Sequence, residues 1–278
     1  MSSANRAPLS DHARRAAATY SAAADHYGGG ALSFWDRFGK ETVARLQLAD
    51  GQRVLDLCCG AGASAIPAAR AVGVNGRVLG IDLAAPLLDM ARARAAGEAL
   101  ANIEFRQADA TASGLADCSF DAVICVFGVF FAAEMTAFTA EMWRLVRPGG
   151  VLAITTWGPG WCEPASTAFW TAVGTIEPSL FKAFNPWDEI TTPVALADLF
   201  VRAGTASPTV IAVPGQHHID HPDRFWDVVL GSGYRATIDA MTGEQQDRVR
   251  HRVLRELRAA NVTILRTDVV FGTSVRPS

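Results

Sequence analysis

The stretch "RVLDLCCGAGASA", residues 53 to 65, joins a short apolar run to a turn rich in glycine and alanine. The run 53–59 predicts a buried strand, and the segment 63–72 that follows predicts a helix. A strand, a glycine turn and a helix in this order are typical of the first unit of a parallel α/β sheet. Open sheets of this kind bind ligands at the carboxyl ends of their strands, so the turn is a candidate ligand site.

Strand and helix patterns then alternate along the chain. Further strands are expected at 76–83, 103–109, 120–131 and 150–158, with helices at 86–100 and 134–146. Two more strands are expected at 208–219 and 267–275, separated by a helical insertion over about 222–260. This spacing predicts an α/β fold with a doubly wound, mostly parallel, seven-stranded sheet that is covered by helices on both faces.

Helical patterns also precede the first strand, around residues 10–24 and 34–48. The expected organisation is therefore an N-terminal helical cap over 1–50 and a ligand-binding α/β core over 51–158. Residues 159–278 are expected to complete the sheet and to supply a wall or lid over the site. All three parts are expected to form one structural domain.

The composition excludes several classes of protein. The 278 residues are 50% apolar, enough for a sizeable core, and the net charge of -3 gives no general reason to bind nucleic acid. The five cysteines contain no C-x-x-C pair, which suits a reducing cytosol and argues against a zinc site. No apolar run is long enough for a membrane span, so a cytoplasmic protein is expected.

The glycine turn has two competing interpretations. Gly60, Gly62 and Ala65 fit the dinucleotide fingerprint G-x-G-x-x-G/A, which would make the protein an NAD(P)-dependent oxidoreductase. However, Asp56 precedes the glycines and would be awkward beside a pyrophosphate. A Tyr-x-x-x-Lys sequence, which a short-chain dehydrogenase would need, does not occur in the chain.

Residues 56–62, "DLCCGAG", resemble the first motif of the class I S-adenosylmethionine-dependent methyltransferases, acid-x-Gly-x-Gly-x-Gly, with Cys58 in place of the first glycine. The resemblance implies a Rossmann-like fold and S-adenosylmethionine as the cofactor. It also implies that Asp56 helps to anchor the amino end of the cofactor, beside Cys58, Gly60 and Gly62.

Further landmarks of the same family follow in order. The resemblance assigns Asp82, in "LGID", to both ribose hydroxyls and places Leu83 against the adenine; Asp109 and Ala110, in "QADAT", would lie at the adenine edge. "FD" at 120–121 and "LVRPGG" at 145–150 also fit. The resemblance is closest to the quinone-biosynthesis C-methyltransferase type, at the level of this core. Two aromatic residues complete the expected cofactor contacts, namely Phe127 and Tyr20.

The expected methyl acceptor is a small, largely apolar or aromatic metabolite. Residues 126–131, "VFGVFF", lack the polar sequence by which amino-methylating enzymes clamp a flipped base. Five of the seven tryptophans lie between 157 and 226, which predicts an aromatic wall. The candidate acceptor contacts are Phe130, Phe131, Trp157 and Trp161.

A general base is not essential for methyl transfer, since positioning alone can supply much of the rate. If there is one, the histidines of "QHHIDH" are candidates, namely His217, His218 and His221. A homodimer is a further expectation. A catalytically silent, methyltransferase-like partner subunit remains an alternative function.

Overall fold

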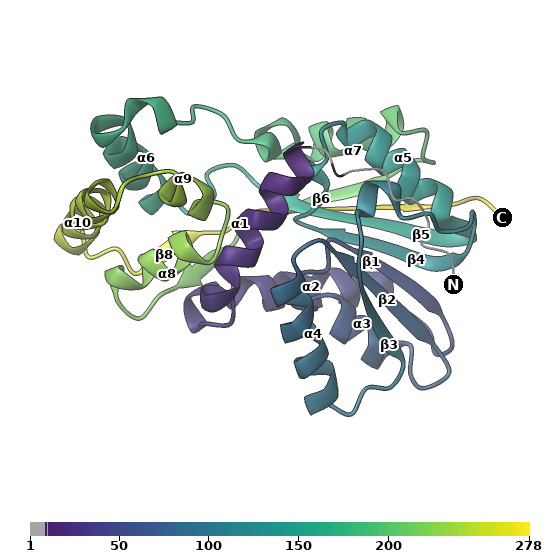
Figure 1. Cartoon of the computed structure of the whole chain (residues 1–278). Helices are drawn as coiled ribbons and strands as arrows, with labels where there is room; N and C mark the ends of the chain where they lie inside the picture. The colour runs from purple at the N-terminus through teal and green to yellow at the C-terminus, as the bar shows by residue number, and fades with distance from the viewer. Residues whose placement is uncertain (1–8, 10) are drawn as a thin grey trace.

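The structure is a computed structural model that describes residues 9 and 11–278. Its centre is a seven-stranded sheet in the order β3-β2-β1-β4-β5-β9-β6 (Figure 1). The strands are β1 (Arg53–Leu57), β2 (Arg77–Asp82), β3 (Ile103–Gln107), β4 (Phe120–Val126), β5 (Val146–Trp157), β6 (Thr209–Val213) and β9 (Val269–Val275). β1 to β5 pair in parallel, whereas β9 is antiparallel to both of its neighbours. The predicted doubly wound, mostly parallel sheet is confirmed.

The two faces of the sheet carry separate apolar layers. Along β1, Val54 packs in a cluster with the helix α3, while Leu55 and Leu57 pack in the larger cluster on the opposite face. Successive side chains of a strand point to opposite faces, so the uninterrupted apolar run is what a strand covered on both sides requires. The helices connected to these strands are α3 (Ala65–Ala71), α4 (Ala85–Gly97), α5 (Met135–Leu145) and α7 (Pro193–Arg202).

The two expected N-terminal helices are present as α1 (Asp11–Tyr27) and α2 (Phe34–Leu46), joined by the short 3-10 turn η1 (Gly30–Leu32). α1 contacts α4 on one side and the helices of the C-terminal insertion on the other. In Figure 1 it lies between the sheet and that insertion. The helix is therefore placed where the parallel strands end.

The C-terminal part contains the expected helical insertion. It consists of α8 (Phe225–Leu230), α9 (Arg235–Asp239) and α10 (Gly243–Ala259), and α10 packs against α6 (Ala165–Ile176) at the left of Figure 1. Short 3-10 turns flank these helices, namely η4 (Pro178–Leu180), η5 (Pro186–Ile190) and η6 (Pro222–Arg224). Among the described residues, no helix combines the length and apolarity needed to cross a bilayer.

The prediction of a single strand over 208–219 was wrong. The segment divides into β6 and a separate strand, β7 (Gln216–His218), which pairs with β8 (Ile264–Arg266) in a small second sheet. Pro214 has no N–H to offer a ladder, and a Cβ at Gly215 would lie 2.2 Å from the carbonyl oxygen of Thr267. The chain turns at these two residues, so the histidines that follow leave the main sheet.

Candidate functional site

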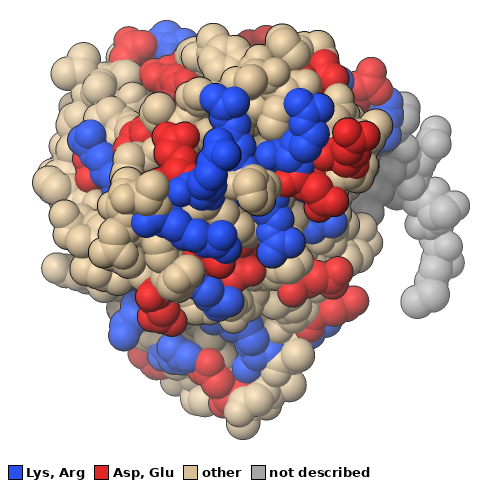
Figure 2. Space-filling view, turned by 90° about the vertical axis from the view of Figure 1, so that its left-hand side faces the viewer, with Lys and Arg blue, Asp and Glu red and all other residues tan. Residues whose placement is uncertain are grey.

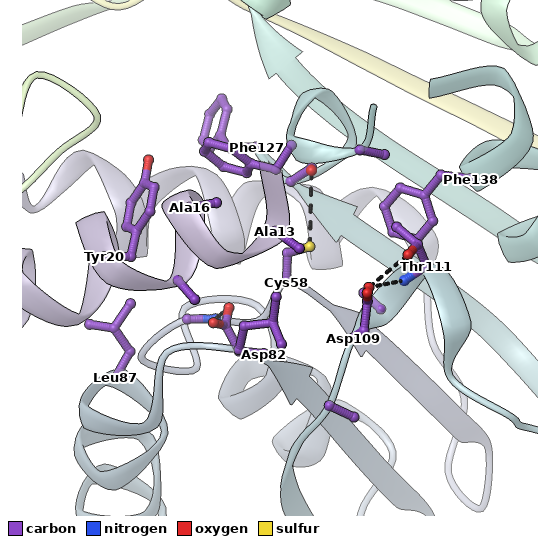
Figure 3. Close-up of a pocket in the computed structure, with 18 of the residues that line it drawn as sticks. Ala13, Ala16, Tyr20, Cys58, Asp82, Leu87, Asp109, Thr111, Phe127 and Phe138 are labelled. Atoms are coloured by element: carbon purple, nitrogen blue, oxygen red, sulfur yellow. Dashed lines mark hydrogen bonds between the residues drawn. The ribbon is translucent and has the colours of Figure 1, made fainter. Parts of the chain in front are cut away.

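A cavity of about 360 Å³ lies at the carboxyl ends of β1 to β4. α1 covers it with Ala13, Ala16, Ala17 and Tyr20. Figure 3 shows Cys58, Asp82 and Asp109 grouped at the ends of neighbouring strands, with Ala16 and Tyr20 of α1 beside them. The residues predicted to contact a cofactor or acceptor that do line the cavity are Tyr20, Cys58, Gly60, Asp82, Leu83, Asp109, Ala110, Phe127 and Phe131.

The turn after β1 brings its backbone to the cavity wall. Gly60 has a φ of 51°, and a Cβ there would lie 3.1 Å from the hydroxyl of Tyr27. Cys58 also adopts a left-handed conformation, with φ 60°, at the position where the family motif has glycine. This conformation costs a non-glycine residue about 1 kcal/mol or more. The turn therefore keeps the backbone path of a glycine loop while a thiol occupies part of the wall.

Asp82 ties this turn to the end of β2. One carboxylate oxygen accepts a hydrogen bond from the N–H of Gly60 (2.9 Å), and the other accepts one from the N–H of Ala84 (2.8 Å). Burial raises the pKa of Asp82, an effect that these backbone donors oppose. A carboxylate oxygen can accept more than one hydrogen bond, so both oxygens retain acceptor capacity toward the cavity.

Asp109 lies at the end of β3 and caps the short 3-10 turn η2 (Ala110–Ala112). Its Oδ1 accepts hydrogen bonds from the N–H (2.9 Å) and the hydroxyl (2.7 Å) of Thr111. These bonds are drawn in Figure 3. They fix the carboxylate at the cavity edge beside Ala110, whose small side chain leaves room for a flat group.

Two tyrosines and a tryptophan from the N-terminal segment also line the cavity. The Tyr20 ring meets Phe131 edge to face, with centroids 5.2 Å apart, and Tyr27 stacks on Trp35 at 5.7 Å. Burial, with the nearby Asp82 and Cys58, raises the pKa of Tyr20, so its phenol stays neutral at physiological pH. Trp35 Nε1 has no hydrogen-bond partner among the described residues, which leaves a donor without a partner beside the cavity.

Two residues predicted to contact the cofactor lie elsewhere. Asp56 is fully buried, and its Oδ2 accepts a hydrogen bond from the hydroxyl of Ser64 (2.7 Å). It points to the same face as Val54 because strand side chains alternate. Burial raises the pKa of Asp56 to about 7. Gly62 also does not line the cavity. It faces α3 instead, where an added Cβ would lie 3.0 Å from the side chain of Ile66.

Three predicted acceptor contacts form a layer outside the cavity. Trp157 is buried and stacks on Phe127 with centroids 3.8 Å apart. Trp161 in turn contacts Trp157, at 5.1 Å, and Phe130 contacts the neighbouring Phe131, at 4.8 Å. Phe127 and Phe131 therefore face the cavity, while Phe130, Trp157 and Trp161 support them from the side away from it.

None of the three candidate histidines lines the cavity. His217 is buried in β7, with Nε2 2.9 Å from the carbonyl oxygen of Ala31, and burial lowers its pKa. His218 is exposed in the same strand, and His221 caps η6 by accepting a hydrogen bond from the N–H of Asp223 (3.3 Å). The turn at 214–215 directs all three away from the strand ends, so the structure does not support a base from this stretch.

Sequence reasoning missed several residues of the cavity. The small residues of α1, at positions 13, 16 and 17, share one helix face with Tyr20, and this spacing was a signal for a close approach. Leu87 and Phe138 come from the first turns of α4 and α5. Within the described residues, no group of three or more His, Cys, Asp or Glu side chains is arranged to hold a metal ion.

Comparison with known proteins agrees with this geometry. Residues 54–150 match the methyltransferase domain family. The core of this chain is a class I methyltransferase domain. The predicted family is thereby confirmed for the core, and S-adenosylmethionine is the cofactor that this family implies; the match contains every strand-end residue of the cavity from Cys58 to Phe127.

Two relatives each match less than half of this chain. An uncharacterised protein of Mycobacterium tuberculosis is 37% identical over 119 residues, which are 43% of this chain and 42% of that protein. The demethylmenaquinone methyltransferase of Lactococcus lactis is 34% identical over 125 residues, 45% of this chain and 50% of that enzyme. The chain thus spans about half the length, or less, of these relatives.

One solved structure extends the likeness of fold to nearly the whole chain. It is the phosphoethanolamine N-methyltransferase 2 of Haemonchus contortus, with a TM-score of 0.60 and 16% identity. The alignment covers 97% of this chain and 61% of that one. At this identity the likeness concerns the fold of the methyltransferase domain and its N- and C-terminal additions, and not the substrate.

Proposed function

We propose that the protein transfers a methyl group from S-adenosylmethionine to a small, largely apolar or aromatic acceptor. The observation that supports this most is the convergence of Gly60, Asp82 and Asp109 on one cavity beneath α1. These residues leave three different strands, and their order along the chain is that of the family landmarks. The cavity volume of about 360 Å³ lies within the usual range of small-molecule sites.

The lining fits this cofactor in chemistry as well as in size. Asp82 would accept hydrogen bonds from both ribose hydroxyls, which are charge-assisted and therefore strong. Leu83 and Ala110 would enclose the adenine, with Asp109 at its edge. The turn at Gly60 allows the backbone to approach the ligand closely, because no Cβ projects from it. Cys58, Phe127 and Tyr20 would complete the contacts.

When bound, S-adenosylmethionine supplies a methyl group on a positively charged sulfur, which keeps the electron pair of the broken carbon–sulfur bond. The chain's part is to position the acceptor and to exclude water. α1 covers the cavity, and Phe127, Phe131 and Phe138 give it an apolar wall. Holding two reactants in line can supply effective molarities of about 10⁵ M or more, so no dedicated base is required.

The acceptor class follows from the same wall. Phe131 and Phe138 line the cavity directly, and Trp157 and Trp161 back it with further aromatic rings. An acceptor held by such surfaces is apolar or aromatic, with few polar groups. The likeness to a demethylmenaquinone methyltransferase supports an acceptor of the quinone type.

We further propose that residues 1–50, 51–158 and 159–278 act as cap, cofactor core and wall within one structural domain. The buried aromatic cluster supports this organisation. Trp157 of β5 contacts Phe34 and Trp35 of α2 and also Trp161 of the segment after β5. A ligand in the cavity would therefore contact or lie near all three parts.

The function is tested with S-adenosylmethionine labelled in its methyl group. The protein is incubated with it and with a panel of acceptors that includes hydroquinones with alkyl chains, hydroxylated aromatic acids and aliphatic amines. Label is expected in an apolar aromatic product, and it should be lost when Asp82 is changed to Asn. Transfer to the amines alone, or no transfer to any aromatic acceptor although the cofactor binds, would contradict the proposed acceptor class.

A further inference from the structure

The helix α10 presents an arginine-rich face on the outside of the molecule. Its apolar side chains Val249, Val253, Leu254 and Leu257 are buried, and the helix packs on α6. Between residues 248 and 258 it carries five arginines and His251 but one acid, Glu256, although the chain as a whole has a net charge of -3. Figure 2 looks at the side of the molecule where α10 lies and shows Lys and Arg side chains gathered near the middle of this face.

Three of these arginines form no ion pair with the described part of the chain. Arg258 pairs with Asp223 through two contacts of 2.6 Å, and Arg250 lies 5.8 Å above the ring of Trp226. Within residues 11–278, no carboxylate oxygen lies within 4.0 Å of Arg248, Arg252 or Arg255. Their spacing of four and three residues places them on one side of the helix.

The three arginines line a shallow groove against the end of α6. Thr175 and Ile176 form its other side, with Glu244 and Asp247 at the end of the groove near the start of α10. A hydrogen bond of 2.7 Å from Gln245 to Glu177 fixes the two helices together at this point. The groove is therefore a fixed surface on which three arginines outnumber two carboxylates, and no ion pair joins them within 4.0 Å.

Exposed aromatic side chains follow the C-terminal end of α6. Phe181 and Phe184 are 49% and 54% exposed, in the loop between η4 and η5. The ring of Phe181 packs on α6, 6.2 Å from Trp170 and 3.2 Å from the position of a Cβ on Gly174. Basic and apolar groups thus flank the same end of one helix.

We propose that this surface, made of Arg248, Arg252, Arg255, Phe181 and Phe184, docks the protein on an anionic lipid bilayer. The arginines would pair with headgroup phosphates, while the phenylalanines would enter the interface between headgroups and acyl chains. A nucleic acid duplex would use the arginines, but its bases are stacked inside and would offer the two exposed phenylalanines no apolar surface. The combination favours a lipid surface.

Packed aromatic rings lead from Phe181 of the docking surface toward the cavity, namely Trp170, Tyr234, Trp161 and Trp187. Trp187, three residues beyond Phe184, contacts Phe130 at 5.4 Å, and Phe130 contacts Phe131 of the cavity wall at 4.8 Å. An apolar acceptor dissolved in the bilayer would meet an apolar path toward the site. This last step rests on the proposed function, whereas the docking itself does not.

Co-sedimentation of the whole protein with vesicles tests the docking without any acceptor. Phosphatidylcholine vesicles are compared with vesicles that also contain phosphatidylglycerol, at low and at high salt. Binding is expected to the anionic vesicles only and to weaken with salt. Changing Arg248, Arg252 and Arg255 together to Gln should lower the affinity by roughly 100-fold, and changing Phe181 and Phe184 to Ser by about tenfold.

A matched control removes three exposed arginines that each pair with a carboxylate elsewhere, namely Arg70, Arg106 and Arg202, also by change to Gln. It should bind the vesicles as the parent protein does. The proposal is overturned if the parent protein does not bind anionic vesicles, or if the control and the α10 variant lose affinity equally. Binding to a short nucleic acid duplex without binding to vesicles would overturn it as well. Cofactor affinity, measured on the same variants, should stay unchanged, so the two proposals fail independently.

Discussion

Asp82 is the side chain on which cofactor binding should depend most. Its two oxygens already hold the turn at Gly60 and the start of α4, and the proposed ribose contacts use the same carboxylate. Asp82→Asn removes the charge and one acceptor, so it should weaken the binding of S-adenosylmethionine by about 2 kcal/mol. Calorimetric titration measures this, with Asp89→Asn, at an exposed position, as the control. An unchanged affinity of the Asp82 variant would remove Asp82 from the site.

Asp56 should make the free energy of unfolding fall as the pH rises, the opposite of what a carboxylate with a lowered pKa does. Burial raises its pKa from 3.8 to about 7, so the folded protein binds a proton that the unfolded chain releases between these pH values. Stability contributed by this group is present at low pH and is lost as the pH rises toward 7. Asp56→Asn removes the titration.

The corresponding measurement is denaturant unfolding of both proteins at several pH values. From pH 5 to pH 8, the free energy of unfolding of the Asn variant should rise relative to that of the parent by about 2 to 3 kcal/mol. A difference that stays constant over this range would show that Asp56 titrates normally in the folded protein.

At the scale of residues, the sequence was informative where a side chain directly follows a strand. Asp82 and Asp109 line the cavity, because the ends of adjacent parallel strands meet at one edge of the sheet, and their contacts with a cofactor stay predictions. Asp56 was misplaced because it lies within a strand, where one step along the chain changes the face. Trp157 was misplaced since an aromatic residue suits a core and a cavity wall equally.

At the scale of elements, α1 is the part that closes the site. Its small residues face the cavity, so a large side chain on that face should fill the space of the cofactor. Ala17→Trp is expected to weaken S-adenosylmethionine binding by tenfold or more, an effect of about 1.4 kcal/mol, whereas Ala18→Trp, one residue along on the exposed face, should not. Equal affinities in the two variants would show that α1 does not close the site in solution.

Element prediction succeeded where the apolar pattern was long and failed at turns. The strands β1 to β5 and the helices between them follow from alternating apolar runs over residues 53–157. The separate sheet of β7 and β8 did not follow, because both strands have three residues and depend on the contact of Gly215 with Thr267. Such a contact between distant backbone segments leaves little trace in the local pattern.

At the scale of the whole molecule, the aromatic cluster around Trp157 joins the cap, the core and the wall. The Trp157 ring is fully buried and contacts rings from all three parts. Trp157→Ala should lower the free energy of unfolding by about 3 to 5 kcal/mol. The parent should unfold in a single transition by fluorescence and by circular dichroism. Two separate transitions would show that residues 159–278 fold independently of the core.

The central claim is that the cavity beneath α1 binds S-adenosylmethionine. Its most direct test is calorimetric titration of the purified protein with this cofactor and, in a separate experiment, with NADH. One molecule of S-adenosylmethionine per chain should bind, the Ala17→Trp and Asp82→Asn variants should bind it more weakly, and NADH should give no saturable heat. Saturable binding of NADH with none of S-adenosylmethionine would contradict the account.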